Sequence, residues 1–202
     1  MKKYFNPLLS ALIIILLFQC SEKNSGSIAN DVLMGEVPLY HGFESQIKFG
    51  EHLVLVGGCN DCHTPKKMTV HGPVLDSALW LSGHPAEMPK IKVDRAEMEA
   101  KGLAVTGDLT EWIGPWGVSY AANLTPDETG IGTWKVEQLF KVFREGKYKG
   151  LDGSRMILPP MPWEMFKYYT DEEVEAIFAY LKSIKPISNQ VPPPLPPLSA
   201  VN

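Results

Sequence analysis

Apolar residues recur at intervals of three and four along three segments of the chain, which is the spacing of one face of an α-helix. In the first segment this face consists of Phe43, Ile47, Gly50 and Val54. The segment is expected to end at the glycine pair 57–58, because glycine favours the backbone conformations that terminate a helix. The sequence therefore predicts a helix that leads directly into the cysteines that follow.

Two further helices are predicted in the second half of the chain. One lies at about residues 133–144 and ends before Gly146. Its inward positions are Val136, Phe140 and Phe143. The other begins at residues 170–173, Thr-Asp-Glu-Glu, which match a capping box. Its apolar stripe, which stops before Pro186, consists of Val174, Ile177, Leu181 and Ile184.

The region between these helices shows little of the alternation that predicts strands. Residues 94–101, followed by Gly102, indicate a short surface helix. Residues 103–120 are predicted to be loop with brief strands. The expected fold class is therefore mainly α, in one domain at residues 41–187.

The N-terminus has the features of a targeting segment. Lys2 and Lys3 precede an apolar run at residues 8–18, which is too short to span a bilayer comfortably. The run leads into Leu-Phe-Gln-Cys, which looks like a bacterial lipoprotein signal. We expect residues 1–19 to be a signal peptide, removed to leave a lipidated Cys20. The alternative is an ordinary secretory signal with an unrelated cysteine.

Polar and proline-rich segments flank the predicted domain. Residues 20–40 begin with a polar stretch that lacks periodicity, and they predict a flexible leash from the lipid anchor. Residues 188–202 contain a run of prolines, which favours an extended polyproline conformation. We interpret this tail as stiff, solvated chain, with a recognition peptide as the alternative.

The charge balance argues against nucleic acid as a partner. The chain has 19 basic and 23 acidic residues, a net charge of −4. Loss of the signal peptide removes two basic and no acidic residues, so the mature chain carries −6. No basic stripe remains to bind nucleic acid.

The segment 59–63, Cys-Asn-Asp-Cys-His, is the attachment pattern of a c-type haem. Two thiols three positions apart can form thioethers with the two haem vinyl groups, and His63 then lies next to the iron as the proximal ligand. Cys20, Cys59 and Cys62 are the three cysteines, and each has its own covalent use. The sequence therefore predicts one covalently bound haem c.

Other uses of Cys59 and Cys62 fit the sequence less well. A redox dithiol is typical of a βαβ neighbourhood, which the pattern does not predict. Structural zinc takes four nitrogen or sulfur ligands, and no second cysteine or histidine pair is present. A structural disulfide is the remaining alternative.

The sixth iron ligand separates an electron carrier from an enzyme. Methionine closes the iron and raises its reduction potential, whereas an open position allows ligand binding. Met161 lies in the segment Leu-Pro-Pro-Met-Pro, where prolines stiffen the loop that presents it. We expect Met161 to be the ligand and the other methionines to fill the core. The rival ligands are His41, His52, His71 and His84, of which His71 and His84 flank an insertion that could cover the haem.

Several strings together resemble the class I c-type cytochromes, and more closely the cytochrome domains found with bacterial periplasmic dehydrogenases. The most specific is 123–134, Asn-Leu-Thr-Pro-Asp-Glu-Thr-Gly-Ile-Gly-Thr-Trp. The others are Gly-Glu-His-Leu-Val at 50–54, Gly-Cys-Asn-Asp-Cys-His-Thr-Pro at 58–65, Pro-Met-Pro-Trp at 160–163 and Ala-Tyr-Leu-Lys at 179–182. The resemblance covers about residues 44–186. Such dehydrogenase subunits often carry three haem motifs, whereas this chain has one, and its insertion at 66–120 is large.

The resemblance implies roles for further residues. The first and last helices would cross, with Gly50 allowing close approach and Tyr180 packing over it. Met161 matches the axial methionine of the family. The Pro65 carbonyl would accept the Nδ1 proton of His63. The string that begins at Asn123 would wrap one haem edge, or simply form a turn and helix cap.

Arg155 matches a basic position that can pair with a haem propionate, with a solvated arginine as the alternative. The expected fold is then a class I cytochrome c-like helical fold around one haem, with a large loop insertion.

The functional expectation is a membrane-tethered electron carrier with no enzymatic activity and no small-molecule substrate. Its partners would be the membrane, through Cys20, and a dehydrogenase, respiratory complex or oxidase. It would sit in the bacterial cell envelope, facing the periplasm or the cell exterior. The alternatives are a haem peroxidase or gas-binding sensor with an open distal site, and an electron-entry subunit of a dehydrogenase complex.

Overall fold

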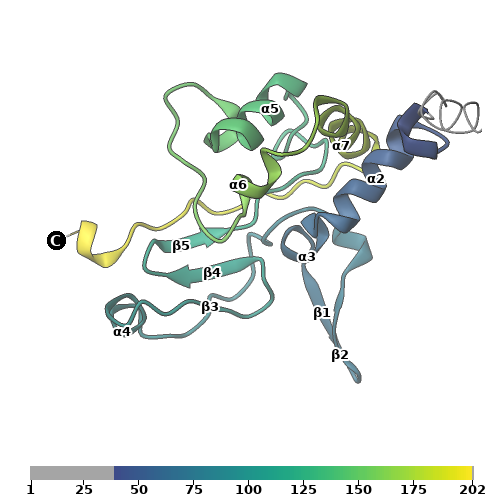
Figure 1. Ribbon diagram of the computed structural model, residues 1–202. Coiled ribbons are helices and arrows are strands. Elements are labelled where there is room, and N and C mark those ends of the chain that lie inside the picture. The colour runs from purple at the N-terminus through teal and green to yellow at the C-terminus, as the bar shows by residue number, and fades with distance from the viewer. Residues whose placement is uncertain (1–38, 202) are drawn as a thin grey trace, which may run out of the picture. The chain divides into compact units, whose positions relative to one another are not determined.

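The computed structural model describes residues 39–201 (Figure 1). The predicted signal peptide, Cys20 and most of the predicted leash lie outside these residues. The main helices are α2 (Gln46–Val56), α5 (Val136–Glu145) and α7 (Asp171–Ser183). Shorter helices are α3 (Cys59–His63), α4 (Arg95–Ala100) and α6 (Trp163–Phe166). Within the described residues, no helix is long and apolar enough to cross a membrane.

Helices α2 and α7 cross in close contact, as the resemblance implies. A Cβ atom added to Gly50 would lie 1.9 Å from the backbone oxygen of Ala176 and 2.9 Å from the Cβ of Tyr180. Only glycine permits this approach. Tyr180 is 8% exposed, and its hydroxyl accepts a hydrogen bond from Trp80 Nε1 at 3.0 Å.

The core between the helices is apolar, but two of the expected inward faces are rotated. In α2 the buried residues are Phe49, Gly50, Leu53 and Val54, while Ile47 is 43% exposed. Ser45 caps this helix through Lys48 N, so Phe43 precedes it and Ile47 falls in its exposed first turn. In α5 the buried residues are Leu139, Val142 and Phe143. Val136 and Phe140 are only partly buried.

The predicted helix ends are confirmed. Gly146 closes α5 in the left-handed conformation, with φ 64°. Thr170 and Glu173 form the capping box of α7, with Thr170 Oγ1 accepting from Glu173 N at 3.2 Å and Thr170 N donating to Glu173 at 2.6 Å. Val174, Ile177 and Leu181 are buried beneath it.

The fold class is confirmed in part, because the insertion contains two small antiparallel sheets. Strands β1 (Lys66–Thr69) and β2 (Gly72–Leu75) form a hairpin. Strands β3 (Val105–Thr106), β4 (Glu111–Gly114) and β5 (Gly117–Tyr120) form a second sheet in that order. The molecule is therefore helical with some sheet. Figure 1 shows the hairpin projecting from the body beside α3.

The interpretation of the C-terminal segment as solvated chain is wrong. Leu195 forms an antiparallel bridge with Val118 of β5, with N–O distances of 2.9 and 3.0 Å. Arg95 of α4 donates to the carbonyl of Pro196 at 2.7 Å, and Glu99 accepts from Leu198 N at 2.7 Å. Prolines lack amide donors but keep their carbonyls, so the extended chain can still be held from one side. We call residues 187–198 the C-terminal strap.

Candidate functional site

Cys59 and Cys62 lie one turn apart on the short helix α3. Gly58 precedes the helix in the left-handed conformation, with φ 67°, and redirects the chain from the end of α2. Gly57 ends α2, and a Cβ there would lie 2.7 Å from the hydroxyl of Tyr169. Residues three apart in a helix share a face. Both thiols, which are free and partly buried, therefore lie on one side of α3.

His63, at the end of α3, is 9% exposed and fixed through one ring nitrogen. Nδ1 lies 2.7 Å from the carbonyl oxygen of Ala122, to which it donates. Among residues 39–201 no hydrogen-bond partner is found for the other nitrogen, Nε2. A histidine held through Nδ1 in this way presents Nε2 as a ligand with its tautomer fixed.

The expected hydrogen-bond partner of His63 was the Pro65 carbonyl, and this contact shows that the partner is the Ala122 carbonyl. The Pro65 carbonyl instead accepts from Asp76 N at 2.8 Å, at the base of the β1–β2 hairpin. Pro65 is only two residues from His63, and its carbonyl is turned into the insertion. Sequence reasoning missed Ala122, because a backbone acceptor 59 positions away carries no side-chain signal.

Burial controls the protonation of all three groups. It lowers the pKa of His63 and so favours the neutral imidazole that can act as a ligand. It raises the pKa of Cys59 to about 11, and it also raises the pKa of Cys62. Both thiols are therefore protonated at neutral pH, unlike the thiolates of a reactive dithiol.

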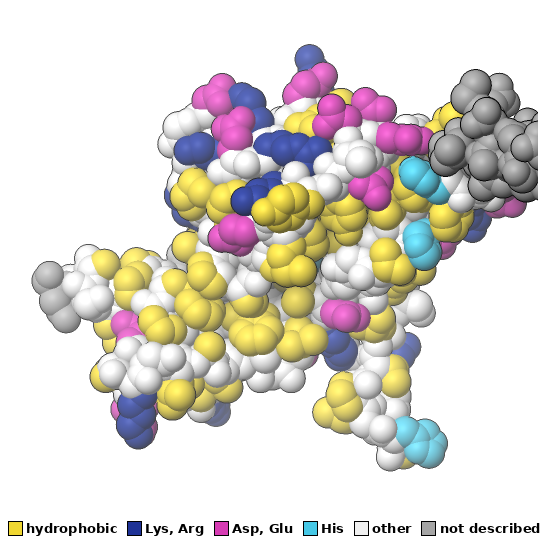
Figure 2. All heavy atoms as spheres, in the orientation of Figure 1, with side chains coloured by type: hydrophobic (Ala, Val, Ile, Leu, Met, Phe, Trp, Pro, Cys, Tyr) yellow, Lys and Arg dark blue, Asp and Glu magenta, His cyan; other side chains and the backbone are white. Residues whose placement is uncertain are grey.

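Met161 lies in the loop before α6 and packs, partly buried, against the same hydrophobic core as Cys59. The loop is fixed to the sheet, since Ser119 of β5 donates to the Pro159 carbonyl at 2.6 Å. The loop lines a hollow of about 200 Å³, formed by Ile157, Pro159, Pro160, Met161, Pro162, Trp163 and Glu164. Figure 2 shows apolar side chains across this part of the face, and charged ones gathered over α5 and α7.

Asn123 is buried, and its side-chain amide is hydrogen-bonded to neighbouring residues. Its amide nitrogen donates to Thr129 Oγ1 at 3.0 Å and to the Ile187 carbonyl at 2.8 Å. Its amide oxygen accepts from the N–H and the hydroxyl of Thr125, at 2.9 and 2.8 Å. These bonds use both donors and both acceptor positions. These bonds support a turn-forming role for Asn123, and its assignment to cofactor binding stays a prediction.

Arg155 is exposed and makes local contacts. Its guanidinium carbon lies 3.9 Å from the ring centroid of Tyr148, and Nη1 donates to the Met156 carbonyl at 2.9 Å. Such stacking leaves part of the guanidinium edge available. Pairing with a propionate stays a prediction.

The four rival histidines differ widely in their surroundings. His71 is exposed in the turn between β1 and β2. His41 lies 4.0 Å from Glu172, and the ring of His52 contacts that of Phe43. His84 is 2% exposed, and its Nδ1 donates to Thr110 Oγ1 at 2.8 Å.

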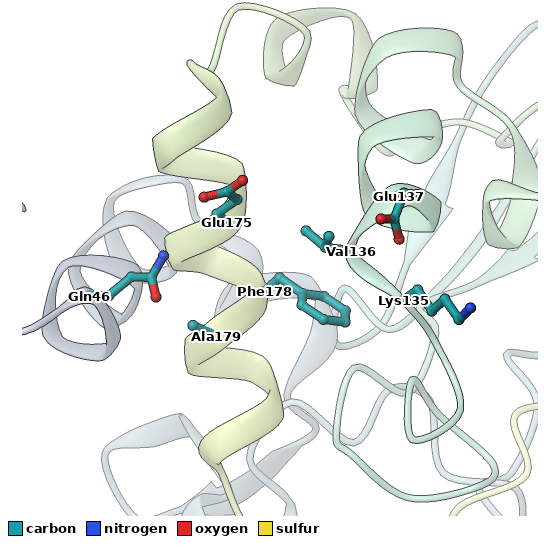
Figure 3. A pocket seen from close by; sticks show the side chains of 7 residues that line it. All are labelled: Gln46, Lys135, Val136, Glu137, Glu175, Phe178 and Ala179. Atoms are coloured by element: carbon teal, nitrogen blue, oxygen red, sulfur yellow. The ribbon is translucent and has the colours of Figure 1, made fainter.

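A second hollow, of about 480 Å³, opens between α5 and α7 next to the start of α2 (Figure 3). Phe178 of α7 projects into the space between the two helices, toward the segment of Lys135 and Val136. None of the residues predicted to hold a cofactor lines it. Its other lining residues are Gln46, Lys135, Glu137, Glu175 and Ala179.

Comparison with characterised proteins supports the resemblance noted in the sequence. The chain is 38% identical over 79 residues to one of the subunits of nicotinate dehydrogenase from Pseudomonas putida, which is 39% of this chain and 6% of that protein. It is 36% identical over 80 residues to the fructose dehydrogenase cytochrome subunit of Gluconobacter japonicus, covering 39% of this chain and 16% of the relative.

A longer match extends the similarity over most of the domain. The gluconate 2-dehydrogenase cytochrome c subunit of Pantoea cypripedii is 26% identical over 147 residues, 72% of this chain and 25% of that protein. No protein family model matches the chain. The chain spans a quarter or less of the length of these three relatives.

The chain thus resembles proteins of the cytochrome c type. In particular, the chain resembles the cytochrome subunits of bacterial dehydrogenases.

Proposed function

We propose that this protein is an electron carrier that holds one haem c through Cys59 and Cys62, with His63 and Met161 as axial ligands. The observation that carries the proposal is the arrangement at α3. Two thiols share one face of a single helical turn, and a buried histidine follows with Nδ1 bonded to Ala122 and Nε2 without a partner among the described residues.

Haem c would supply reversible one-electron exchange between Fe(III) and Fe(II). The residues of this chain would fix its position. Cys59 and Cys62 would hold the porphyrin covalently, because their spacing on α3 puts both sulfur atoms on one side, and Gly58 turns the chain into this helix. His63 would bind the iron through Nε2, while the Ala122 carbonyl keeps its ring in one orientation.

Met161 is proposed as the sixth ligand because its loop is held on both sides. The Pro159 carbonyl is bonded to Ser119, and Trp163 N donates to the carbonyl of Met161 itself at 3.0 Å. A methionine presented by such a loop loses little conformational entropy on binding iron. It would also close the iron to external ligands.

We infer the cellular setting from the N-terminal sequence. Lipidated Cys20 would tether the protein to a membrane of the bacterial envelope, facing the periplasm or the exterior. Its redox partners would be a dehydrogenase, a respiratory complex or an oxidase. The names of the relatives are also compatible with a second candidate, an electron-entry subunit within a dehydrogenase complex.

Covalent attachment is tested by mass spectrometry of protein matured in a host competent for cytochrome assembly. The intact protein should gain the mass of one haem, and the Cys59→Ala/Cys62→Ala variant should gain none. A measured mass equal to that of the protein without haem would contradict the proposal.

Ligation is tested with a matched pair of methionine variants. Met161→Ala should lose the near-infrared methionine-to-iron band of the oxidised protein and lower the midpoint potential. Met165→Ala, four residues away and 69% exposed, should leave both unchanged. Rapid carbon monoxide binding by the reduced native protein would instead support the peroxidase or sensor alternative.

The anchor and the partner are tested in membranes. Cys20→Ala should release the protein into the soluble fraction, whereas Cys59→Ala should not. Co-purification with a dehydrogenase subunit from detergent-solubilised membranes would favour the electron-entry subunit over a free carrier.

A further inference from the structure

The acceptor for His63 belongs to a backbone segment whose position is set by a second segment. Residues 121–124 are bonded to residues 81–84, because His84 N donates to the Ala121 carbonyl and Leu124 N donates to the Leu81 carbonyl, both at 2.9 Å. Ala122 lies between these two bonds. The orientation of its carbonyl therefore depends on where residues 81–84 lie.

The same segment also contacts the backbone of His63. Gly83 N donates to the His63 carbonyl at 2.8 Å. Gly83 has φ +78°, and a Cβ there would lie 2.5 Å from the carbonyl carbon of Ala122. The backbone of Gly83 is thus packed tightly between His63 and Ala122. A small shift of residues 81–84 would move the acceptor relative to the imidazole.

Asn189 of the C-terminal strap fixes residues 81–84 from the other side. Its side-chain nitrogen donates to the carbonyls of Ser82 and His84, at 2.7 and 2.9 Å, on either side of Gly83. Its side-chain oxygen accepts from Ala86 N at 3.1 Å. Both donors and the oxygen of the amide are therefore bonded to one short segment of the insertion.

The strap is in turn fixed to the segment that carries the acceptor. Asn189 N donates to Thr129 Oγ1 at 3.0 Å. Two residues earlier, the carbonyl of Ile187 accepts from Asn123 at 2.8 Å, and Ile187 N donates to Thr125 Oγ1 at 3.1 Å. The strap therefore joins residues 81–86 to the turn at 123–129 and holds them at a set separation.

We propose that Asn189 is a positioning residue for the axial histidine: it clamps residues 82–86 so that the Ala122 carbonyl is held against Nδ1 of His63. This inference rests on the proposed function. It gives the C-terminal strap a role in setting the reduction potential of the haem.

The direction of the effect follows from the hydrogen bond. A well-aligned bond from Nδ1–H to a carbonyl makes the imidazole a stronger donor, and a stronger donor stabilises Fe(III) over Fe(II). Removing the clamp should weaken this bond. The midpoint potential should then rise, and the Nδ1 proton resonance of His63 should move upfield.

The experiment compares two variants of the full-length holoprotein, Asn189→Ala and Arg95→Ala. Arg95 holds the same strap at Pro196 and bonds none of the residues that Asn189 bonds. Both variants should lower the melting temperature. Only Asn189→Ala should raise the potential, shift the Nδ1 resonance and speed the hydrogen exchange of the His84 and Leu124 amides.

The outcomes separate the inference from the function on which it rests. Wild-type protein without covalent haem overturns both. Wild-type protein with haem, together with an Asn189→Ala variant of unchanged potential and Nδ1 resonance, overturns the inference alone. Equal shifts in Asn189→Ala and Arg95→Ala also overturn it, because the strap would then act only through general stability.

A second variant covers the case in which Asn189→Ala does not mature. Asn189→Ser keeps one short polar group and part of the clamp. Its potential should rise less than that of the alanine variant, and its Nδ1 resonance should shift in the same direction. An unchanged potential in the serine variant contradicts the inference.

Discussion

The helical core and the insertion with its strap are stabilised by different kinds of contact. Between α2, α5 and α7 the buried side chains are apolar, with Val54 and Val174 at 0% exposure and Ile177 at 1%. In the insertion and the segment after it, many buried residues are polar and hydrogen-bonded. They include Ser82, His84, Thr110, Glu111, Ser119, Asn123 and Thr125.

This contrast determines what each region contributes. Apolar packing is not directional, and it joins helices whose faces can be recognised by their spacing. Hydrogen bonds are directional, and those in the insertion join residues as far apart as Ser82 and Asn189. The core provides the stability of the domain, while the polar region orients the groups around His63.

The largest effect is expected at the helix crossing. Gly50→Ala would place a Cβ atom 1.9 Å from the backbone oxygen of Ala176, so α2 and α7 must separate. We expect a loss of about 4 kcal/mol or more in the free energy of unfolding, measured by urea denaturation. The control is Ile47→Ala in the same helix, which should cost less than about 1 kcal/mol. Equal losses would contradict the assignment of this crossing as the core.

A smaller effect is expected where the strap meets the sheet. Gly117 and Gly72 both have positive φ, +96° and +105°, so alanine at either position is strained by about 1–2 kcal/mol. Only at Gly117 would the new Cβ also collide, 2.1 Å from the Leu195 carbonyl. Gly117→Ala should therefore expose the strap to proteolysis, and Gly72→Ala should not. Equal cleavage of the two variants would show that the strap does not depend on this contact.

Loss of the N-cap of α7 should lower the stability of the protein by less than either of these changes. Thr170→Ala removes the side chain that accepts from Glu173 N at the start of α7. We expect a loss of about 1 kcal/mol in the free energy of unfolding. Ser188→Ala, an exposed position, should change stability by less than about 0.5 kcal/mol. A cap variant as stable as this control would mean that the end of α7 frays in the native protein.

The parts of the fold that sequence could predict are those with local signals. The end of α5 at Gly146 and the capping box at Thr170 follow from residues within a few positions of each other. The close approach at Gly50 was available only through the family resemblance, because a glycine within a helix does not reveal its partner. The inward faces of α2 and α5 were displaced because the exact helix start sets which residues face the core.

The candidate site divides in the same way. The pattern of Cys59, Cys62 and His63 is contiguous and could be recognised, and α3 places the two thiols on one face. The hydrogen-bond acceptor for His63 could not be recognised from the sequence, since Ala122 acts through its backbone carbonyl and any residue would supply one. Proline content suggested a solvated tail, but it says nothing about carbonyls that accept hydrogen bonds, such as that of Pro196.

The smallest effect concerns one half-buried carboxyl group in the turn beside the strap. Hydrogen bonds from the hydroxyl and the N–H of Thr129 hold the pKa of Asp127 below its usual range. A lowered pKa in the folded state adds stability above the unfolded pKa, and this stability is lost as pH falls below about 4.

Thr129→Val should return the Asp127 pKa toward its usual value in an NMR titration. The pKa of Asp152, lowered by its bond to Lys141, should stay where it is. If the pKa values of both carboxyl groups changed together, the variant would be altering the fold as a whole and not only the turn. A change at Asp127 alone would show that the Thr129 hydroxyl holds this turn, to which Asn189 N of the strap also donates.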